Sequence, residues 1–146
     1  MKELILKIKR TIRYLFYRNL NIIEQIEISE QLIDSNLLCQ YWKMSKADRQ
    51  HSYEVFSRTK NIYDNKELLL LSLLHDIGKA KIDAGLFFRV FTDIGLIKNY
   101  KSKMYLNHEI IGLQILKDIN ASENIIEYYN INLLNQKNII LDKTDY

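Results

Sequence analysis

The three histidines of the chain fall in segments with helical periodicity, and none lies in a segment typical of plain surface. His51 lies on the apolar stripe of a predicted helix, His75 follows a run of leucines, and His108 falls in the first turn of another helix. A single inward-facing histidine is more often a hydrogen-bonded core residue than a ligand, because buried polar groups need partners. Position alone therefore leaves a structural and a chemical role open for His51 and His108.

The pair His75–Asp76 is harder to explain as a purely structural feature. It ends a leucine-rich helix predicted over residues 65–78, so both side chains are expected to be at least partly buried. Burial and the negative end of the helix dipole both disfavour a charged carboxylate. A divalent cation would compensate both effects, since imidazole and carboxylate are good ligands for first-row transition metals. Lys79 could supply the same charge without a metal, and the spacing does not choose between the two.

The segments that carry these residues are predicted to be helices, because their apolar residues recur with helical period and no alternation of period two occurs. Proline is absent and only 4 of the 146 residues are glycine, which also favours helices over a turn-rich β fold. Ser45 and Asn107 are predicted helix caps, and a further helix is predicted to start near Ser122. Gly78 is predicted to end its helix in the left-handed conformation. The expected helices span residues 34–44, 45–63, 65–78, 86–97, 107–119, 122–129 and 139–141. The chain is therefore expected to be all-α and to form one domain, preceded by a first helix and a polar linker.

The first twenty residues contain six basic residues and one acidic residue, whereas the remainder carries a net charge of −2. Because most of the chain is nearly neutral, no nucleic-acid partner is expected. One stripe of the first segment is apolar and consists of Leu4, Ile5, Ile8, Ile12, Leu15 and Phe16. Such a basic amphipathic helix can lie on a membrane surface. Packing of the stripe against the domain, with a solvated basic face, is the favoured interpretation.

The single cysteine, Cys39, excludes an internal disulfide and is typical of a reducing compartment. No window of the sequence approaches the roughly 18 apolar residues that span a bilayer, and the start lacks the pattern of a signal peptide. A cytoplasmic location is expected from these features.

Two stretches of the sequence resemble the HD-domain superfamily of metal-dependent phosphohydrolases. They are Ser-Lys-Ala-Asp-Arg-Gln-His-Ser over residues 45–52 and Leu-Leu-His-Asp-Ile-Gly-Lys over residues 73–79. The chain is most similar to small bacterial members in which an Asp-x-x-His segment precedes the HD helix. The resemblance implies a helical bundle of the HD-domain type over residues 31–146, after an N-terminal helix and linker over residues 1–30.

The resemblance also implies a metal centre. It identifies His51, His75 and Asp76 as ligands, with a later aspartate as the fourth. Asp142 and Asp145 are both candidates, and the family's terminal Leu-x-x-x-Asp pattern favours Asp145. The expected cofactor is one divalent ion, and this mixed set of ligands suits Mn, Fe, Co, Ni or Zn.

Two further residues have expected roles in catalysis. His108 resembles an additional histidine that many members carry before a glycine-containing helix, where it could bind phosphate, transfer a proton or hold a second metal. Lys79 could contact a substrate phosphate or cap the carbonyl groups of its helix. Tyr128 and Tyr129 stand where dinuclear relatives have histidines. A mononuclear centre is therefore expected, and the cyclic-dinucleotide phosphodiesterases are disfavoured.

The leading hypothesis is a phosphohydrolase that cleaves a phosphate ester, such as a nucleotide, with a metal-activated water. The alternative is a catalytically inactive regulatory domain that keeps the fold and binds a nucleotide or a metal. A third and weaker hypothesis is a module that docks on a membrane or a protein through the basic first helix.

Overall fold

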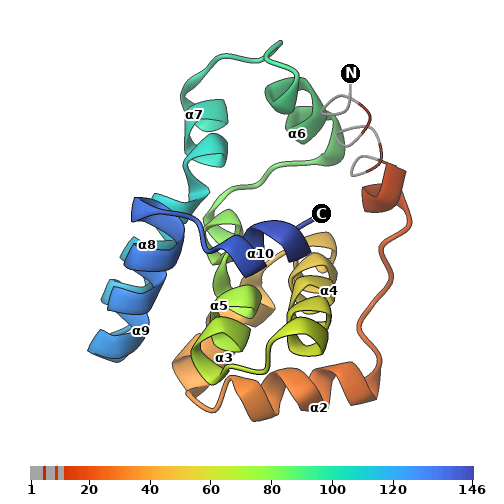
Figure 1. Cartoon of the computed structure of the whole chain (residues 1–146). Helices are drawn as coiled ribbons and strands as arrows, with labels where there is room; N and C mark the ends of the chain where they lie inside the picture. Colours follow the sequence, from red (N-terminus) through yellow and green to blue (C-terminus); the bar gives the residue numbers. More distant parts are fainter. Residues whose placement is uncertain (1–4, 6–8, 10–11) are drawn as a thin grey trace.

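Residues 5, 9 and 12–146 are described by a computed structural model, and this part of the chain consists of helices and loops without a strand (Figure 1). Its elements are α2 (Ile22–Gln31), α3 (Ser35–Lys43), α4 (Lys46–Ile62), α5 (Lys66–Leu74), the 3-10 helix η1 (Ile77–Lys81), α6 (Leu86–Asp93), α7 (Tyr100–Leu106), α8 (His108–Asp118), α9 (Glu123–Tyr129), the π-helix η2 (Asn130–Asn135) and α10 (Ile139–Thr144). The prediction of an all-α, single-domain fold is confirmed. None of these helices is both long and apolar enough to cross a bilayer.

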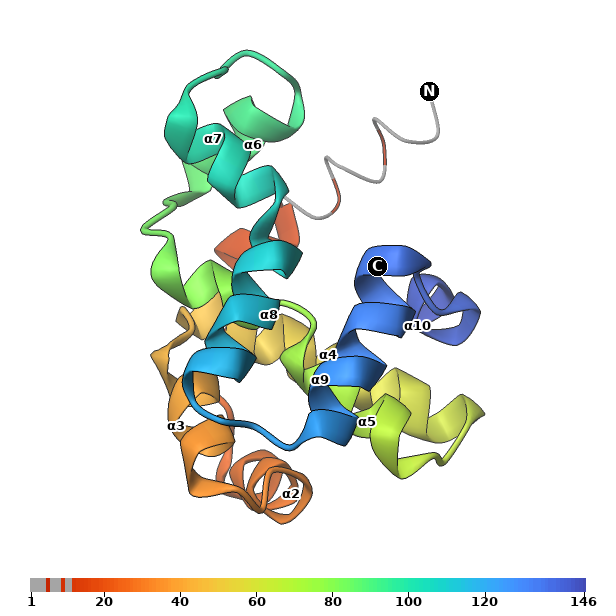
Figure 2. The same ribbon diagram turned by 90° about the vertical axis from the view of Figure 1, so that its left-hand side faces the viewer.

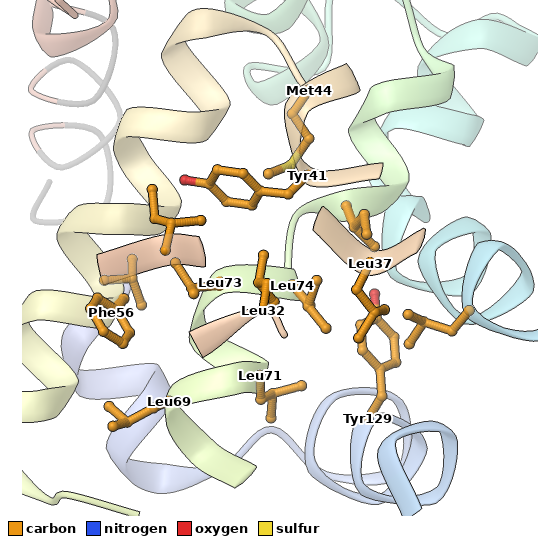
Figure 3. Packing of buried hydrophobic residues seen from close by; sticks show 14 of the residues in the cluster. Leu32, Leu37, Tyr41, Met44, Phe56, Leu69, Leu71, Leu73, Leu74 and Tyr129 are labelled. Atoms are coloured by element: carbon orange, nitrogen blue, oxygen red, sulfur yellow. The ribbon is translucent and has the colours of Figure 1, made fainter. Parts of the chain in front are cut away.

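The helix α5 lies at the centre of the bundle and has buried side chains around its circumference. It begins after Asn65, whose side chain accepts a hydrogen bond from the Leu68 amide at 2.9 Å. α4 packs along α5, and α2 and α9 also contact it. Figure 3 shows its leucines among apolar side chains from α3, α4 and α9, including Leu37, Tyr41, Phe56 and Tyr129. Because each fully buried leucine contributes roughly 1.5–3 kcal/mol to folding, α5 is a rigid support for His75 and Asp76, which follow it.

The leucine-rich helix ends earlier than predicted, and Gly78 does not adopt the left-handed conformation. α5 stops at Leu74, and Gly78 lies inside η1, which packs closely against α8. A β-carbon on Gly78 would lie only 1.8 Å from the His108 carbonyl oxygen and 2.8 Å from the Gly112 amide nitrogen. Glycine is therefore required at this position for the close approach of two backbones, not for a helix cap.

The helix α10 lies against α4, which carries His51 (Figure 2). The hydroxyl groups of Thr59 and Thr144 are 2.9 Å apart in a hydrogen bond, and Arg58 donates to the Thr144 carbonyl oxygen at 3.0 Å. The predicted cap of α4 is present, since the Ser45 hydroxyl accepts a hydrogen bond from the Asp48 amide at 3.1 Å. The contacts of Arg58 and Thr59 join the end of the described chain to the C-terminal part of α4.

Two α-helices, α2 and α7, and the π-helix η2 were not predicted, and one predicted cap is absent. Residues 22–31, expected to belong to a polar linker, form α2, which starts with a capping box between Asn21 and Glu24 and buries Ile28 completely. The helix expected over 86–97 ends at Asp93, and α7 follows as a separate helix after Gly95, whose φ is +77°. The Asn107 side chain does not cap α8, because it donates to the Lys103 carbonyl oxygen instead.

The described part of the first segment places its polar side chains toward the domain. Arg13 Nη1 lies 3.4 Å from Glu54 Oε2, and the Tyr14 ring centroid lies 5.0 Å from the Arg89 guanidinium carbon. Four members of the apolar stripe are exposed instead: Ile5 48%, Ile12 51%, Leu15 63% and Phe16 78%. Leu4 and Ile8 lie outside the described residues. The favoured interpretation, in which the stripe packs against the domain, is therefore wrong for these four residues.

Candidate metal centre

His75 and Asp76 lie in the turn between α5 and η1, and both are almost fully buried at 3% and 2% exposure. His75 Nδ1 lies 2.8 Å from the Ser72 carbonyl oxygen, so the ring N–H donates there and the Nε2 lone pair is free. Within the described residues, His75 Nε2 is a buried nitrogen without a hydrogen-bond partner. Burial lowers the pKa of His75, which keeps the imidazole neutral. A buried acceptor without a partner costs about 1–3 kcal/mol, and a metal ion would satisfy it.

His51 and Asp145 approach His75 from α4 and from the residue that follows α10. The ring centroids of His51 and His75 are 5.6 Å apart. Asp145 Oδ1 lies 3.0 Å from His51 Nε2 and 3.9 Å from His75 Nε2. Asp142 is 69% exposed and does not line the cavity that holds the histidines. Of the two candidate aspartates, the fold therefore brings Asp145 to the histidines.

The resulting set of donor atoms fits a divalent transition metal. One ligand atom each from His51, His75 and Asp76 lies within 4.8 Å of the others, close to the roughly 4 Å that two metal–ligand bonds of about 2 Å can span. Asp145 adds a second carboxylate beside both imidazoles. Two nitrogens and two carboxylates are a ligand set for Mn, Fe, Co, Ni or Zn.

Asp76 is held from two sides by the predicted catalytic residues. Lys79 Nζ lies 2.7 Å from Asp76 Oδ2, and His108 Nε2 lies 2.9 Å from Asp76 Oδ1. Burial by itself would raise the pKa of Asp76, but the charge of Lys79 and the hydrogen bond from His108 outweigh it and hold this pKa well below its ordinary value. The sequence left open whether a lysine or a metal compensates the negative charge of Asp76. In the structure, Lys79 supplies a compensating positive charge. It does not satisfy His75 Nε2, which stays without a partner within the described residues.

Asp145 has a cationic partner that sequence reasoning did not find. Lys137 Nζ lies 2.7 Å from Asp145 Oδ2, and Lys137 precedes α10 in the sequence. Burial would raise the pKa of Asp145, but the hydrogen bond from His51 and the nearby His75 lower it well below its ordinary value. Both carboxylates of the cluster are therefore kept in the charged form that binds cations.

The cluster lies in a cavity of about 320 Å³, at the lower end of the usual size range for small-molecule sites. One side holds the histidines, Asp76 and Asp145. The other walls come from the N-terminal segment, α6 and α7, and include Tyr14, Tyr17, Leu86, Arg89, Tyr105 and Leu106. The cavity thus combines a polar cluster with walls that are largely apolar and aromatic.

A buried ion pair holds this wall to α4, and it too was not anticipated. Arg89 Nη1 and Nη2 lie 2.5 and 2.7 Å from the two carboxylate oxygens of Asp48, which belongs to the motif over residues 45–52. The Arg89 guanidinium also lies 5.0 Å from the Tyr14 ring and 5.7 Å from the Tyr105 ring. Asp48 and Arg89 are separated by 41 residues, so no local pattern could have revealed the pair.

Tyr129 packs behind the site. It is 1% exposed, and its hydroxyl donates to the His75 carbonyl oxygen at 3.4 Å. Its ring leaves no room at Gly112, where a β-carbon would lie 2.1 Å from the tyrosine oxygen. Tyr129 therefore supports the backbone of His75 and does not offer a ligand atom.

All three histidines of the chain line the same cavity, together with Asp76 and Asp145. They come from separate segments, namely α4, the turn after α5 and the start of α8. Comparison of the chain with family models, with curated proteins and with solved structures found no match in any of the three. The chemistry of the site is therefore inferred from the arrangement of these side chains.

Proposed function

We propose that this chain is a metal-dependent phosphohydrolase of the HD-domain type that cleaves a phosphate ester, for example a nucleotide. The observation that carries the proposal is the convergence of His51, His75, Asp76 and Asp145, with a buried His75 Nε2 that lacks a hydrogen-bond partner among the described residues. These are the same four residues that the resemblance of the sequence assigns as ligands. A cation held beside a cavity is one arrangement that can support phosphate-ester hydrolysis, because it can activate a water molecule and offset charge on a phosphoryl group.

In this proposal, His51, His75, Asp76 and Asp145 would hold one divalent ion. When bound, such an ion lowers the pKa of water and offsets negative charge on a phosphoryl group. The protein's own contribution is to orient these ligands. Hydrogen bonding of His75 Nδ1 to the Ser72 carbonyl oxygen fixes the ring so that Nε2 faces the cluster. A hydrogen bond of this kind behind a ligating imidazole commonly strengthens metal binding.

Lys79 and His108 would act on the substrate side of the cluster. Both line the cavity and both contact Asp76. Burial would lower the pKa of Lys79, but Asp76 and Asp48 raise it above its ordinary value, so the ammonium group stays charged. A fixed positive charge beside the cluster attracts a phosphate group. His108 is half-buried at the cavity wall, where its Nδ1 lies 2.8 Å from the Tyr105 carbonyl oxygen and its Nε2 faces Asp76. In this proposal, proton transfer to a leaving group would use Nε2 in place of its contact with Asp76.

The decisive experiment measures metal content and hydrolysis on the same preparations. We expect the purified protein to bind a transition metal and to hydrolyse at least one member of a panel of aryl phosphates and nucleotides, tested with Mn, Fe, Co, Ni and Zn. His75→Ala and Asp145→Asn should lose both properties. Asp142→Asn is the matched control, because Asp142 is an exposed carboxylate three residues from Asp145. Loss of metal from this control, or no loss in the other two variants, contradicts the assignment.

The second candidate is an inactive regulatory domain of the same type. It is favoured by Tyr128 and Tyr129, which stand where dinuclear relatives have histidines, and by the structural role of Tyr129 behind His75. Tight metal binding without turnover of any phosphate ester on the panel would support this candidate. Saturable binding of a nucleotide without turnover would support it further.

A further inference from the structure

A second feature of the molecule lies outside the metal centre and concerns the outer surface of the cavity wall. The N-terminal segment contacts α6, because the Tyr14 ring lies 5.0 Å from the Arg89 guanidinium carbon. Several large apolar side chains of these segments are exposed to solvent. They are Ile12, Leu15 and Phe16 in the first segment and Phe87, Phe91, Ile94 and Leu96 in and after α6. We call these residues, with Lys98, Lys101 and Lys103, the basic apolar face.

The exposure of this face is unusual. An amphipathic helix normally packs its apolar side chains on the domain, whereas the first segment exposes them and directs a basic side chain toward the domain. Arg13 points inward to Glu54 and to the Tyr146 carbonyl oxygen, whereas Leu15 and Phe16 are 63% and 78% exposed. On α6, Phe87 and Phe91 stack with ring centroids 6.5 Å apart, while Arg89 points into the domain. Large exposed apolar patches commonly mark interaction sites.

The distribution of charge favours an anionic partner. Residues 1–20 carry a net charge of +5, and residues 86–106 contain four basic residues and one acidic residue, for a net charge of +3. Three of these basic residues, Arg13, Arg18 and Arg89, form ion pairs with Glu54, Glu24 and Asp48, so the exposed lysines carry the argument. The rest of the chain carries −5, with 11 basic and 16 acidic residues. Lys98, Lys101 and Lys103 are exposed. The positive charge is thus concentrated in the two segments that present the exposed apolar side chains.

Apolar side chains combined with basic ones match the interface of an anionic bilayer. Its acyl boundary accepts phenylalanine, leucine and isoleucine, and its headgroups attract lysine and arginine. The exposed isoleucines Ile22, Ile23 and Ile26 of α2 form a useful contrast. Residues 22–34 contain four acidic residues and no basic residue, so the same anionic surface would repel them.

We propose that the basic apolar face docks the protein on an anionic lipid bilayer. Tyr14, Tyr17, Leu86 and Leu106 line the cavity from the same segments, so docking would place the cavity close to the lipid headgroups. The proposal does not depend on the metal centre, since it rests on exposure and charge alone.

Vesicle flotation of the full chain tests the proposal. We expect the protein to float with vesicles of phosphatidylcholine and phosphatidylserine but not with phosphatidylcholine alone, and to be released by high salt, which screens the attraction. Leu15→Ser combined with Phe16→Ser should lower the partition coefficient at least about tenfold. Lys101→Glu combined with Lys103→Glu should lower binding to the mixed vesicles to a similar extent.

The matched control is Ile22→Ser combined with Ile26→Ser, which removes equally exposed apolar side chains from the acidic helix α2. It should bind vesicles like the wild type, and circular dichroism with thermal melting should show that every variant is folded. Absence of vesicle binding, equal binding to neutral and anionic vesicles, or equal loss in the α2 control would overturn the proposal. Binding of a short duplex oligonucleotide as tight as vesicle binding would also overturn it, by assigning the face to nucleic acid.

Discussion

Asp48 is a buried carboxylate that supports the cavity wall without joining the ligand cluster. It is 3% exposed and accepts two hydrogen bonds from the Arg89 guanidinium and one from the Ser45 hydroxyl. Burial by itself would raise the pKa of Asp48, but Arg89 outweighs this effect and holds the pKa below its ordinary value. The charged pair is therefore part of the folded state at neutral pH.

At neutral pH, Asp48→Asn should lower the free energy of unfolding by about 3–5 kcal/mol, because Arg89 stays buried without its charged partner. The pair contributes fully above the ordinary carboxyl pKa of about 4. Its contribution is lost as the pH falls toward the lower pKa of the folded state. Urea titrations of wild type and variant should therefore show a gap in unfolding free energy that narrows below about pH 4.

The control for this prediction is Asp118→Asn, which breaks an ion pair with Lys81 whose two side chains are about half exposed, at 50% and 52%. Exposed pairs contribute about 0–1 kcal/mol, so this variant should unfold almost like the wild type at every pH. The difference in unfolding free energy between wild type and Asp48→Asn is expected to change with pH. A difference that stays constant would show that the pKa of Asp48 is not lowered in the folded protein.

At the scale of elements, the packing of η1 against α8 positions both His75–Asp76 and His108. Gly78 permits this packing, because any side chain there would overlap the first turn of α8. Tyr129 packs against Gly112 of α8. Both η1 and Tyr129 therefore hold α8 in position. The geometry around Asp76 thus depends on two glycines, Gly78 and Gly112, which leave room for this close packing.

Gly78→Ala should destabilise the fold by about 3 kcal/mol or more, because the methyl group would collide with backbone atoms of His108 and Gly112 that cannot rotate away. Chemical denaturation measures the change. Gly85→Ala is the control, since no atom lies within 4 Å of its β-carbon and its φ of −65° suits alanine. Its stability should stay within about 1 kcal/mol of the wild type. A mild effect at Gly78 would mean that α8 can shift without loss of the fold.

At the scale of the whole molecule, the ligand cluster connects elements that are far apart in the chain. His51 lies on α4, His75 and Asp76 follow α5, and Asp145 follows α10. A cation bound to all of them would hold the central helix, its neighbour and the C-terminal helix together. Metal binding should therefore stabilise the fold as well as serve chemistry.

Differential scanning calorimetry should show this link. A metal present at a hundred times its dissociation constant adds about 2.7 kcal/mol of stability, which corresponds to roughly 5–10 °C in melting temperature for a domain of this size. A chelator should reverse the increase. His75→Ala should melt at the same temperature with and without metal, and an equal metal effect in this variant would place the binding site elsewhere.

The sequence by itself determined most of the helices and several of their caps, because helical periodicity and capping are local properties. Ser45, Asn65 and Ser122 begin α4, α5 and α9 as expected. The helix α2 was not predicted, because its many polar residues made the segment resemble a linker. The structure shows that Ile28 and Leu32 lie in the core. The family and the activity stay predictions from the resemblance of the motif.

Only the tertiary structure decided which residues meet. It selected Asp145 over Asp142, paired Lys137 with Asp145 and Arg89 with Asp48, and exposed the apolar stripe of the first segment. These contacts join residues that no local pattern pairs, so they follow from how the helices pack and not from the period of any one segment. Local forces thus placed His75 and Asp76 at the end of the central helix, while packing supplied their partners.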